Sequence, residues 1–368
     1  MERIQVLDHL KKIIDEAEGG HISYAEFIEL ALYHPDYGYY MRETEKIGRA
    51  GDFITTSNVS DIFGRIVSKW FSWLVGKHGI EPSVCEIGGG NGRFAKAFMD
   101  EWVKNEEKPL SYLIVETSPF HRKLQKEALG SFPGFTQYES IKDIDNFNGL
   151  VFSNELFDAL PVHVVERKEG NLMEAMVGYQ EDQLVEQLVP LTNRAIASFI
   201  DENSLRITEG QRIEIPLAMG TMVQEVANLL TSGLVVTIDY GYTAEEWGWP
   251  SRKKGSLRGY MNHQMHHSVL ENPGRMDITS HIHFDALEKA GKDLGLNSLA
   301  LLRQDEFLIS AGILKELEEN YDPNPFSETS RRNRAIRSLV LPTGMSTAFR
   351  VLIQEKGLQM NAENLFQQ

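Results

Sequence analysis

Residues 84–94, VCEIGGGNGRF, hold four glycines within five positions. Glycine has no Cβ, so it allows tight turns with positive φ and lets the backbone approach a ligand closely. Ser83-Val84-Cys85 predicts a strand before this stretch, and the spacing of Phe94, Ala97 and Phe98 predicts a helix after it. We therefore predict a strand, a glycine turn and a helix.

The spacing of the glycines separates two classes of ligand. The dinucleotide fingerprint G-x-G-x-x-G fails by one residue, because Arg93 stands where the third glycine is needed. The chain instead has an acid and three alternate glycines, Glu86, Gly88, Gly90 and Gly92, which resembles the first motif of S-adenosylmethionine-dependent methyltransferases. A nucleotide or flavin binder and a purely structural turn remain as alternatives.

Glu116 is a second candidate ligand residue, because it ends the next predicted strand, SYLIVE. A carboxylate at this place can accept both hydroxyl hydrogens of a ribose. Both NAD and S-adenosylmethionine contain ribose, so Glu116 supports a nucleoside ligand without choosing between them. The alternative is an ordinary surface acid at the end of a strand.

The fourth predicted strand leads into SNELFDALP, which supplies Asn154, Glu155 and Asp158. The carboxyl ends of strands line the ligand crevice in doubly wound sheets, so these side chains should face the reactive end of a cofactor. Two acids three residues apart can hold a cationic acceptor or take its proton. The alternative is a helix N-cap followed by acids of the first turn.

Five of the eleven histidines lie between residues 263 and 283. Their spacing matches no compact zinc motif well, so we expect ordinary hydrogen-bonding histidines and no metal. Cys85 is the only cysteine and lies in the first predicted strand, where an inert buried thiol is expected. The sequence contains no G-x-S-x-G elbow and no phosphate-binding loop of the G-x-x-x-x-G-K-[ST] type.

Composition limits the class of protein and of partner. The net charge of −16 in 368 residues repels phosphate backbones, so no nucleic-acid partner is expected. The first twenty residues do not resemble a signal peptide or an organelle presequence, and no run of eighteen apolar residues occurs. These features predict a cytoplasmic protein without a membrane span.

The hydrophobic pattern predicts an α/β fold in three parts. Residues 1–80 read as a helical cap with helices near 4–17, 23–33 and 61–75. Residues 81–160 and 231–359 alternate strands and helices, with strands at 83–87, 111–116, 135–138, 149–154 and 233–239, which is typical of a mostly parallel sheet. Residues 161–230 read as an antiparallel insertion that binds the acceptor or a partner, ending in a helix near 222–230.

Three later segments complete the pattern. Residues 241–285 are too long for an ordinary connection and are expected to be functional or disordered. LVLPTGMSTAFRVLIQEKG is expected to form two antiparallel strands around a turn at 342–344. The residues after Gln359 have no core pattern and are expected to form a tail.

Together these motifs resemble the MidA-type methyltransferases, whose mitochondrial members assist assembly of respiratory complex I and methylate an arginine of one of its subunits. The resemblance rests on HPDYGYY, GDFITTSNVS, EIGGGNG, VETSP, SNELFDALPVH, ITEGQRIEI, IDYG, GSLRGY and PGRMDITSHIHF, in this order between about residues 34 and 284. The family's usual Gly-Pro-Gly-Arg-Gly loop here carries Gly89 and Asn91 instead.

The resemblance implies a class I methyltransferase sheet of seven strands that binds S-adenosylmethionine. It implies that the glycine loop, with Glu86, holds the methionine part of the cofactor, that Glu116 holds the ribose and that Asp143 lies at the adenine edge. Asn154 would face the cofactor, and the GDFITT loop would close over it through Asp52, Thr55 and Thr56.

It further implies in-line transfer of the methyl group to a nitrogen, with a protein arginine as the expected acceptor, which a carboxylate must orient and deprotonate. Glu155 is the first choice for that carboxylate, Asp158 the second and Asp239 the third, while Asp277 and His281 would shape the acceptor mouth. A small-molecule methyltransferase and a noncatalytic assembly scaffold remain as alternatives.

Overall fold

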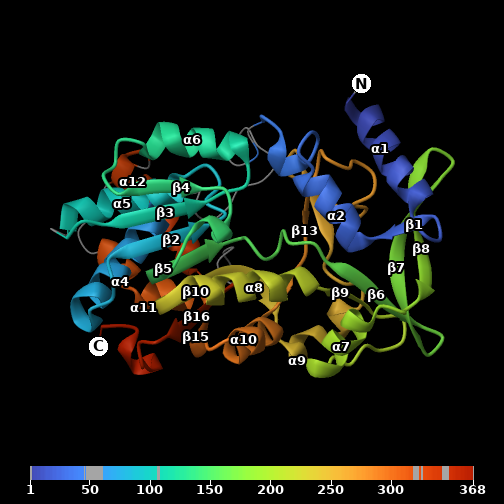
Figure 1. Cartoon of the computed structure of the whole chain (residues 1–368). Helices are drawn as coiled ribbons and strands as arrows, with labels where there is room; N and C mark the ends of the chain where they lie inside the picture. The colour runs from blue at the N-terminus through green and yellow to red at the C-terminus, as the bar shows by residue number, and fades with distance from the viewer. Residues whose placement is uncertain are drawn as a thin grey trace.

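The fold comes from a computed structural model, which describes residues 2–44, 46, 61–105, 108–317, 323–324, 326–341 and 348–367. Its centre is a large sheet with the strand order β15-β16-β10-β5-β2-β3-β4 (Figure 1). β14 pairs with the far end of β10. The strands are β2 (Ser83–Ile87), β3 (Ser111–Val115), β4 (Phe135–Tyr138), β5 (Phe147–Asn154), β10 (Leu230–Tyr242), β14 (Ile282–His283), β15 (Asn297–Arg303) and β16 (Phe349–Lys356). Among the described strands of this sheet, β16 pairs antiparallel with β10 and β15, and the remaining pairs are parallel. The predicted α/β fold with a mostly parallel sheet is therefore confirmed.

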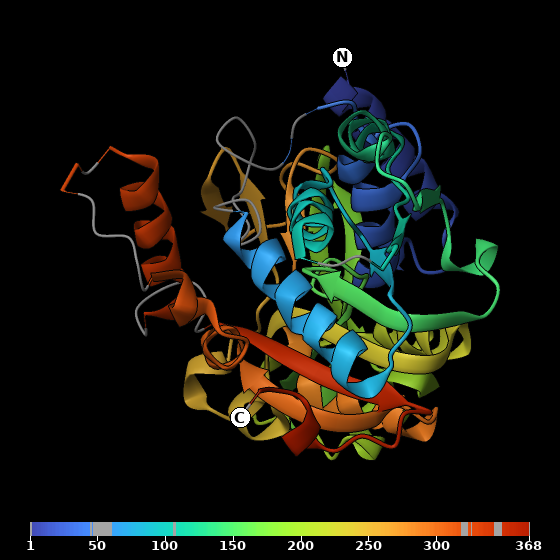
Figure 2. The same cartoon turned by 90° about the vertical axis from the view of Figure 1, so that its left-hand side faces the viewer.

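Helices cover both faces of the large sheet. One face carries α4 (Ile62–His78), α5 (Arg93–Asn105), α11 (Gln304–Ser310) and α12 (Glu328–Val340), which share an apolar core with β2, β5 and β16. The other face carries α8 (Leu217–Leu229) and α10 (Phe284–Asp293). Figure 2 shows α4 crossing the first face at a slant. α6 (Pro119–Leu129) packs beside α5 and begins with Ser118 as its N-cap and proline as its first residue.

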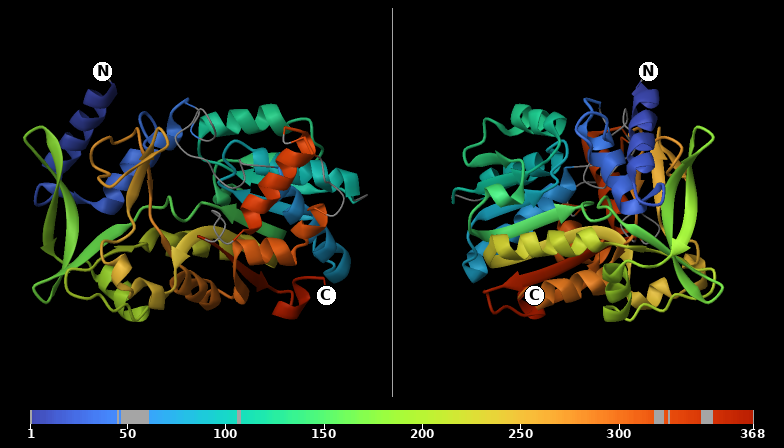
Figure 3. Two further views of the ribbon diagram at one scale, coloured as in Figure 1. Left: turned by 180° about the vertical axis from the view of Figure 1, so that it is seen from behind. Right: turned by 45° about the vertical axis from the view of Figure 1, so that its right-hand side comes forward.

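A second sheet is antiparallel and stands at the far end of the molecule from the C-terminus (Figure 3). It contains β1 (His21–Ser23), β6 (His163–Lys168), β7 (Asn171–Gln180), β8 (Gln183–Pro190) and β9 (Arg212–Ile215). α1 (Glu2–Glu16) and α2 (Tyr24–Tyr33) pack on one face, and α7 (Arg194–Glu202) and α9 (Ala244–Trp247) pack on the other. Ser23 begins α2 with a capping box that it forms with Glu26.

The predicted division into domains stays a prediction. The packing distributes residues 1–80 over both sheets, because α4 lies on the large sheet while α1 and α2 lie on the antiparallel one. The long segment 241–285 forms a small sheet of β11 (Arg258–Met261), β12 (Gln264–His266) and β13 (Asp277–Thr279). This small sheet stands over the carboxyl ends of the large sheet's strands and supplies one wall of the pocket described below.

The prediction of two strands near the C-terminus is partly wrong, because one of the two segments is a helix. β16 is antiparallel as expected, but its partners are β10 and the unpredicted strand β15, and residues up to Val340 belong to α12. Ile336 and Leu339 are buried on one face of that helix. The end of the helix is therefore apolar, and a short apolar run of this kind cannot be told from a strand by its pattern. The turn expected at 342–344 lies outside the described residues.

The tail expected after Gln359 is also wrong, since part of it joins the core. Leu365 is 1% exposed, and its carbonyl accepts a hydrogen bond of 2.7 Å from the indole of Trp70. Cys85 is buried in β2, as predicted.

Candidate active site

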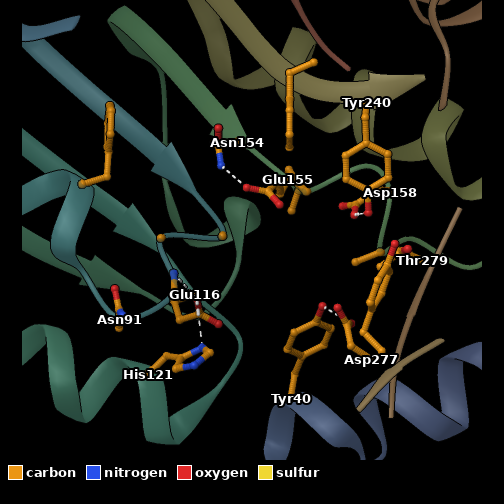
Figure 4. Close-up of a pocket in the computed structure, with 18 of the residues that line it drawn as sticks. Tyr40, Asn91, Glu116, His121, Asn154, Glu155, Asp158, Tyr240, Asp277 and Thr279 are labelled. Carbon is orange, nitrogen blue, oxygen red and sulfur yellow. Dashed lines mark hydrogen bonds and ion pairs between the residues drawn. The ribbon is translucent and has the colours of Figure 1, made fainter. Parts of the chain in front are cut away.

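A cavity of about 620 Å³ opens at the carboxyl ends of β2, β3, β5 and β10 (Figure 4). This is where the strand order of the sheet reverses, between β2 and β5, and such switch points are the usual ligand sites of open α/β sheets. Its floor comes from the glycine turn and the turn after β5. Its opposite wall comes from α2, the short helix η1 (Tyr39–Met41) and the small sheet.

The glycine loop is built for close approach. Gly88, Gly90 and Gly92 have φ angles of 73°, 52° and 76°, which side chains adopt only with strain. A Cβ at Gly89 would lie 2.8 Å from the side chain of Ile114. Gly88, Gly89 and Gly90 line the cavity, whereas Gly92 lies against Gln125 outside it. The loop therefore presents bare backbone to the cavity at three of its four glycines.

Glu116 lies beside this loop with both oxygens fixed. Oε2 accepts from the N–H of Gly90 at 3.0 Å, and Oε1 accepts from the N–H of Ser118 at 2.9 Å. Burial raises the pKa of Glu116 to about 7, although the two backbone N–H groups favour its charged form. Each oxygen keeps a lone pair for a hydroxyl donor, so the carboxylate can also hold a diol.

Two residues of α6 that sequence reasoning missed support this corner of the cavity. His121 lines it, and burial lowers the pKa of its imidazole to about 4, so the ring is neutral. The amide of Gln125 donates to the carbonyl of Gly90 at 2.7 Å. The motif VETSP ends just before both residues, and the helical repeat of α6 places them on its inner face.

Glu86 lies under the loop and lines the cavity. The hydroxyl of Tyr112 donates to its Oε2 at 2.8 Å. Burial raises the pKa of Glu86 to about 8. It therefore presents a largely protonated carboxyl group at neutral pH, which can donate as well as accept.

The turn after β5 brings Asn154, Glu155 and Asp158 to the cavity, as predicted (Figure 4). Glu155 has φ of 53°, a conformation that costs a non-glycine residue free energy and is concentrated at functional sites. The amide of Asn154 donates to Glu155 Oε1 at 3.0 Å. Burial and the neighbouring Asp158 raise the pKa of Glu155 to about 8.

Asp158 is 4% exposed and is bonded on one side only. The hydroxyl of Tyr240 donates to its Oδ2, while Oδ1 has no hydrogen-bond partner among the described residues. The Oδ1 of Asn154 is likewise buried without a partner in the described part of the chain. Two buried acceptor atoms thus lie on residues that line the cavity, and burying them without a donor is costly.

Asp239 lies behind the cavity and does not line it. Its Oδ2 accepts from the backbone N–H groups of Phe157 and Asp158 at 3.0 and 3.2 Å, and its Oδ1 accepts from that of Tyr240 at 2.9 Å. Burial and the charge of Asp158 raise its pKa well above the usual range. Asp239 therefore holds the turn that carries Asp158.

The opposite wall joins segments that are far apart in the sequence. The hydroxyl of Tyr40 donates to Asp277 at 2.6 Å, and the hydroxyl of Tyr33 donates to the carbonyl of Ala159 at 3.0 Å. The two tyrosine rings stack with centroids 5.5 Å apart. Asp277 and His281 were predicted at the acceptor mouth and line the cavity; burial lowers the pKa of His281 to about 3, so its ring is neutral.

Other predicted residues lie elsewhere. Asp143 is exposed, caps the turn that starts at Ser140 and does not line the cavity. Asp52, Thr55 and Thr56 lie outside the described residues. In the described part of the chain, no three histidine, cysteine, aspartate or glutamate side chains are grouped to hold a metal ion.

The cavity thus combines exposed glycine backbone with several carboxyl groups, and comparison with known proteins gives the class of the protein. The sequence profile of the family described as "Putative S-adenosyl-L-methionine-dependent methyltransferase" matches residues 66–302, more than half of the chain. The chain belongs to this family of MidA-type methyltransferases. Its cofactor is S-adenosylmethionine.

Individual relatives agree with this assignment. "Protein arginine methyltransferase NDUFAF7, mitochondrial" of Danio rerio is 27% identical over 376 residues, which cover 94% of this chain and 85% of the relative. The homologue of that protein in Caenorhabditis elegans is 28% identical to this chain, and the match covers 83% of this chain and 77% of the homologue. A Burkholderia thailandensis protein whose crystal structure contains bound S-adenosyl-homocysteine is 26% identical, with a TM-score of 0.90 over 99% of this chain and 95% of its own.

The relatives also correct one prediction. A cytoplasmic location was expected from the composition of the N-terminus, but the curated relatives from fish and worm are mitochondrial, so the expectation is wrong. Among the described residues, no helix is both long enough and apolar enough to cross a membrane.

Proposed function

We propose that this protein transfers the methyl group of S-adenosylmethionine to a guanidinium nitrogen of an arginine in a protein substrate. The observation that carries the proposal is the cluster of oxygen acceptors at the turn after β5. Glu155 and the unpaired oxygens of Asp158 and Asn154 belong to residues that line one cavity with the glycine loop. A planar cation with five N–H donors satisfies such a set better than a neutral acceptor or an ammonium group does.

The residues around the glycine loop are proposed to bind the cofactor. The backbone of Gly88 and Gly90 would lie against its methionine part, with Glu86 and Asn154 nearby, and Gly92 would shape the turn from outside the cavity. Glu116 would hold the ribose hydroxyls. Asp143, Asp52, Thr55 and Thr56 remain proposals that rest on the family resemblance alone.

The bound cofactor supplies an electrophilic methyl group on a sulfonium. This chain must orient one guanidinium nitrogen, keep water out, and take one proton, because the methylated guanidinium and the neutral product together carry one positive charge fewer than the reactants. Glu155 and Asp158 are proposed to contact the acceptor. The bound guanidinium would favour the charged form of both carboxyl groups, and in that form either can receive the proton. Asp239, the third candidate, would act through the turn that it holds.

A protein acceptor is supported by the names of the relatives, which are protein arginine methyltransferases. The wall of Tyr33, Tyr40 and Asp277 also fits an arginine side chain, because aromatic faces and carboxylates both bind guanidinium groups.

The test is methyl transfer from tritium-labelled S-adenosylmethionine to proteins from cells that lack this protein, followed by mass spectrometry of the labelled band. We expect a methylated arginine whose labelling is lost with the Glu155→Gln variant. Label on a small molecule, or on another residue type, would refute the arginine assignment. Full complementation of the deletion strain by Glu155→Gln would instead indicate a scaffold.

A further inference from the structure

Tyr240 lies at the end of β10 and lines the cavity beside Asp158. Its ring packs edge-on against His281 and Phe349, with ring centroids 5.1 and 5.3 Å away. Its hydroxyl donates to Oδ2 of Asp158 across the gap between β10 and the turn after β5 (Figure 4). The ring is therefore fixed by packing, and the hydroxyl is fixed by one carboxylate oxygen.

Two hydrogen bonds hold Asp158, one through its backbone and one through its side chain. Its backbone N–H donates to Asp239, and its Oδ2 accepts from Tyr240. The hydrogen bond from Tyr240 opposes a rotation that would exchange the two carboxylate oxygens, and Oδ1 has no hydrogen-bond partner among the described residues. A carboxylate locked in this way offers one lone-pair direction to an incoming N–H group.

We propose that Tyr240 is a positioning residue for the acceptor: its hydroxyl locks Asp158 so that Oδ1 is presented to the guanidinium. This inference rests on the proposed function. It assigns Asp158 as the carboxylate that contacts the acceptor through a single defined atom, while Tyr240 acts only through Asp158.

The electrostatics of the pocket give the proposal a pH signature. Burial raises the pKa of Asp158 to about 6, and the hydrogen bond from Tyr240 opposes this rise because it stabilises the charged form. Titratable groups from every neighbouring element face Asp158 or share its pocket. They are Glu155 from its own turn, Asp239 from β10, Asp277 from β13, His281 from the turn after β13, Arg258 and Tyr260 from β11, His263 from the turn after β11, Tyr33 from α2, Tyr40 from η1, Glu86 from β2, Glu116 from the end of β3 and His121 from α6. Tyr240→Phe leaves these groups in place and removes one donor.

The experiment titrates methylguanidine into the complex with S-adenosylhomocysteine by calorimetry, between about pH 5 and about pH 9. Removing a hydrogen bond to a charged group weakens binding about ten- to a hundredfold. We therefore expect Tyr240→Phe to bind methylguanidine at least about tenfold more weakly near neutral pH. We also expect the midpoint of its pH profile to move upward by about one unit, because Asp158 then loses its proton at higher pH. Asp158→Asn should remove the component of the pH dependence near pH 6 and leave the component that Glu155, with a pKa of about 8, contributes.

The matched control is Tyr242→Phe, because Tyr242 stacks on the same His281 at 4.7 Å but does not line the cavity. It should leave both affinity and pH profile unchanged, and all three variants should bind S-adenosylhomocysteine like the wild type. An equal loss of affinity at every pH in Tyr240→Phe would mean a purely structural role and would overturn the inference, as would an unchanged profile. Wild-type protein that binds S-adenosylhomocysteine but not methylguanidine would overturn the proposed function and this inference together.

Discussion

Replacing Glu155 with glutamine should make the protein less active and more stable. The substitution keeps the size of the side chain and the oxygen that accepts from Asn154 at 3.0 Å. It removes only the ability to become charged. Losing one acid–base group at a reacting nitrogen lowers the rate about a hundredfold to ten-thousandfold, so turnover should fall while cofactor affinity is retained.

The gain in stability follows from the raised pKa. Burial, then Asp158, move the pKa of Glu155 from 4.5 to about 8 in the folded protein, so the unfolded chain releases this proton first as the pH rises. Between these two values the free energy of unfolding of the wild type therefore falls with increasing pH. With about 1.4 kcal/mol per pH unit, a neutral glutamine should add about 1 kcal/mol near pH 5 and about 3 kcal/mol near pH 7.

Urea unfolding of the cofactor-free protein at these two pH values measures the difference. The control is Glu127→Gln on the exposed side of α6, which should change the free energy of unfolding by less than about 0.5 kcal/mol at either pH. A stabilisation by Glu155→Gln that is the same at both pH values, or a loss of stability near neutral pH, would refute the argument from burial.

Three further predictions concern the cofactor loop and the C-terminus. Calorimetry should show saturable binding of S-adenosylhomocysteine and none of NAD, and the reverse result would contradict the assignment of the glycine loop. Gly90→Val should weaken S-adenosylhomocysteine binding at least about a hundredfold with the circular dichroism spectrum unchanged, because a branched side chain at φ of 52° is strained and Gly90 lines the cavity. Its control, Gly220→Ala on α8, adds a Cβ that meets nothing within 4 Å and should bind like the wild type. Deleting the residues after Gln359 should lower the free energy of unfolding by about 2–5 kcal/mol in urea, since it removes Leu365 from the core and the acceptor of the Trp70 indole; an unchanged midpoint would show that the tail is dispensable.

The parts of the site that could be predicted are those that follow strands. Glycine spacing and the position of Glu116 depend on local sequence. The carboxyl ends of parallel strands meet at one edge of the sheet, and Glu155 and Asp158 line the same cavity as the glycine loop. Asp239 follows the same rule but faces the backbone of the turn, because a single side chain's direction is not set by its strand alone.

The missed residues depend on contacts between distant segments. Tyr33 and Tyr40 reach the cavity only because α2 packs on the antiparallel sheet and η1 meets β13, which no spacing within the sequence indicates. The motifs HPDYGYY and IDYG did mark Tyr40 and Tyr240 as part of a pattern, without giving their partners. The error at the C-terminus has the same cause, since β15 and β16 pair across the whole of α11 and α12.

The place of β16 between β10 and β15 has a consequence for how the chain matures on the ribosome. β10 is a long, largely buried strand, and one of its edges stays open until residues 349–356 leave the exit tunnel. Ala348 and Phe349 also line the cavity, so the pocket is incomplete at that time. From the emergence of β10 until β16 joins it, the nascent chain therefore exposes an apolar strand edge, which can bind chaperones or lead to aggregation. Translation that stalls before this point should yield a protein that neither binds cofactor nor escapes quality control.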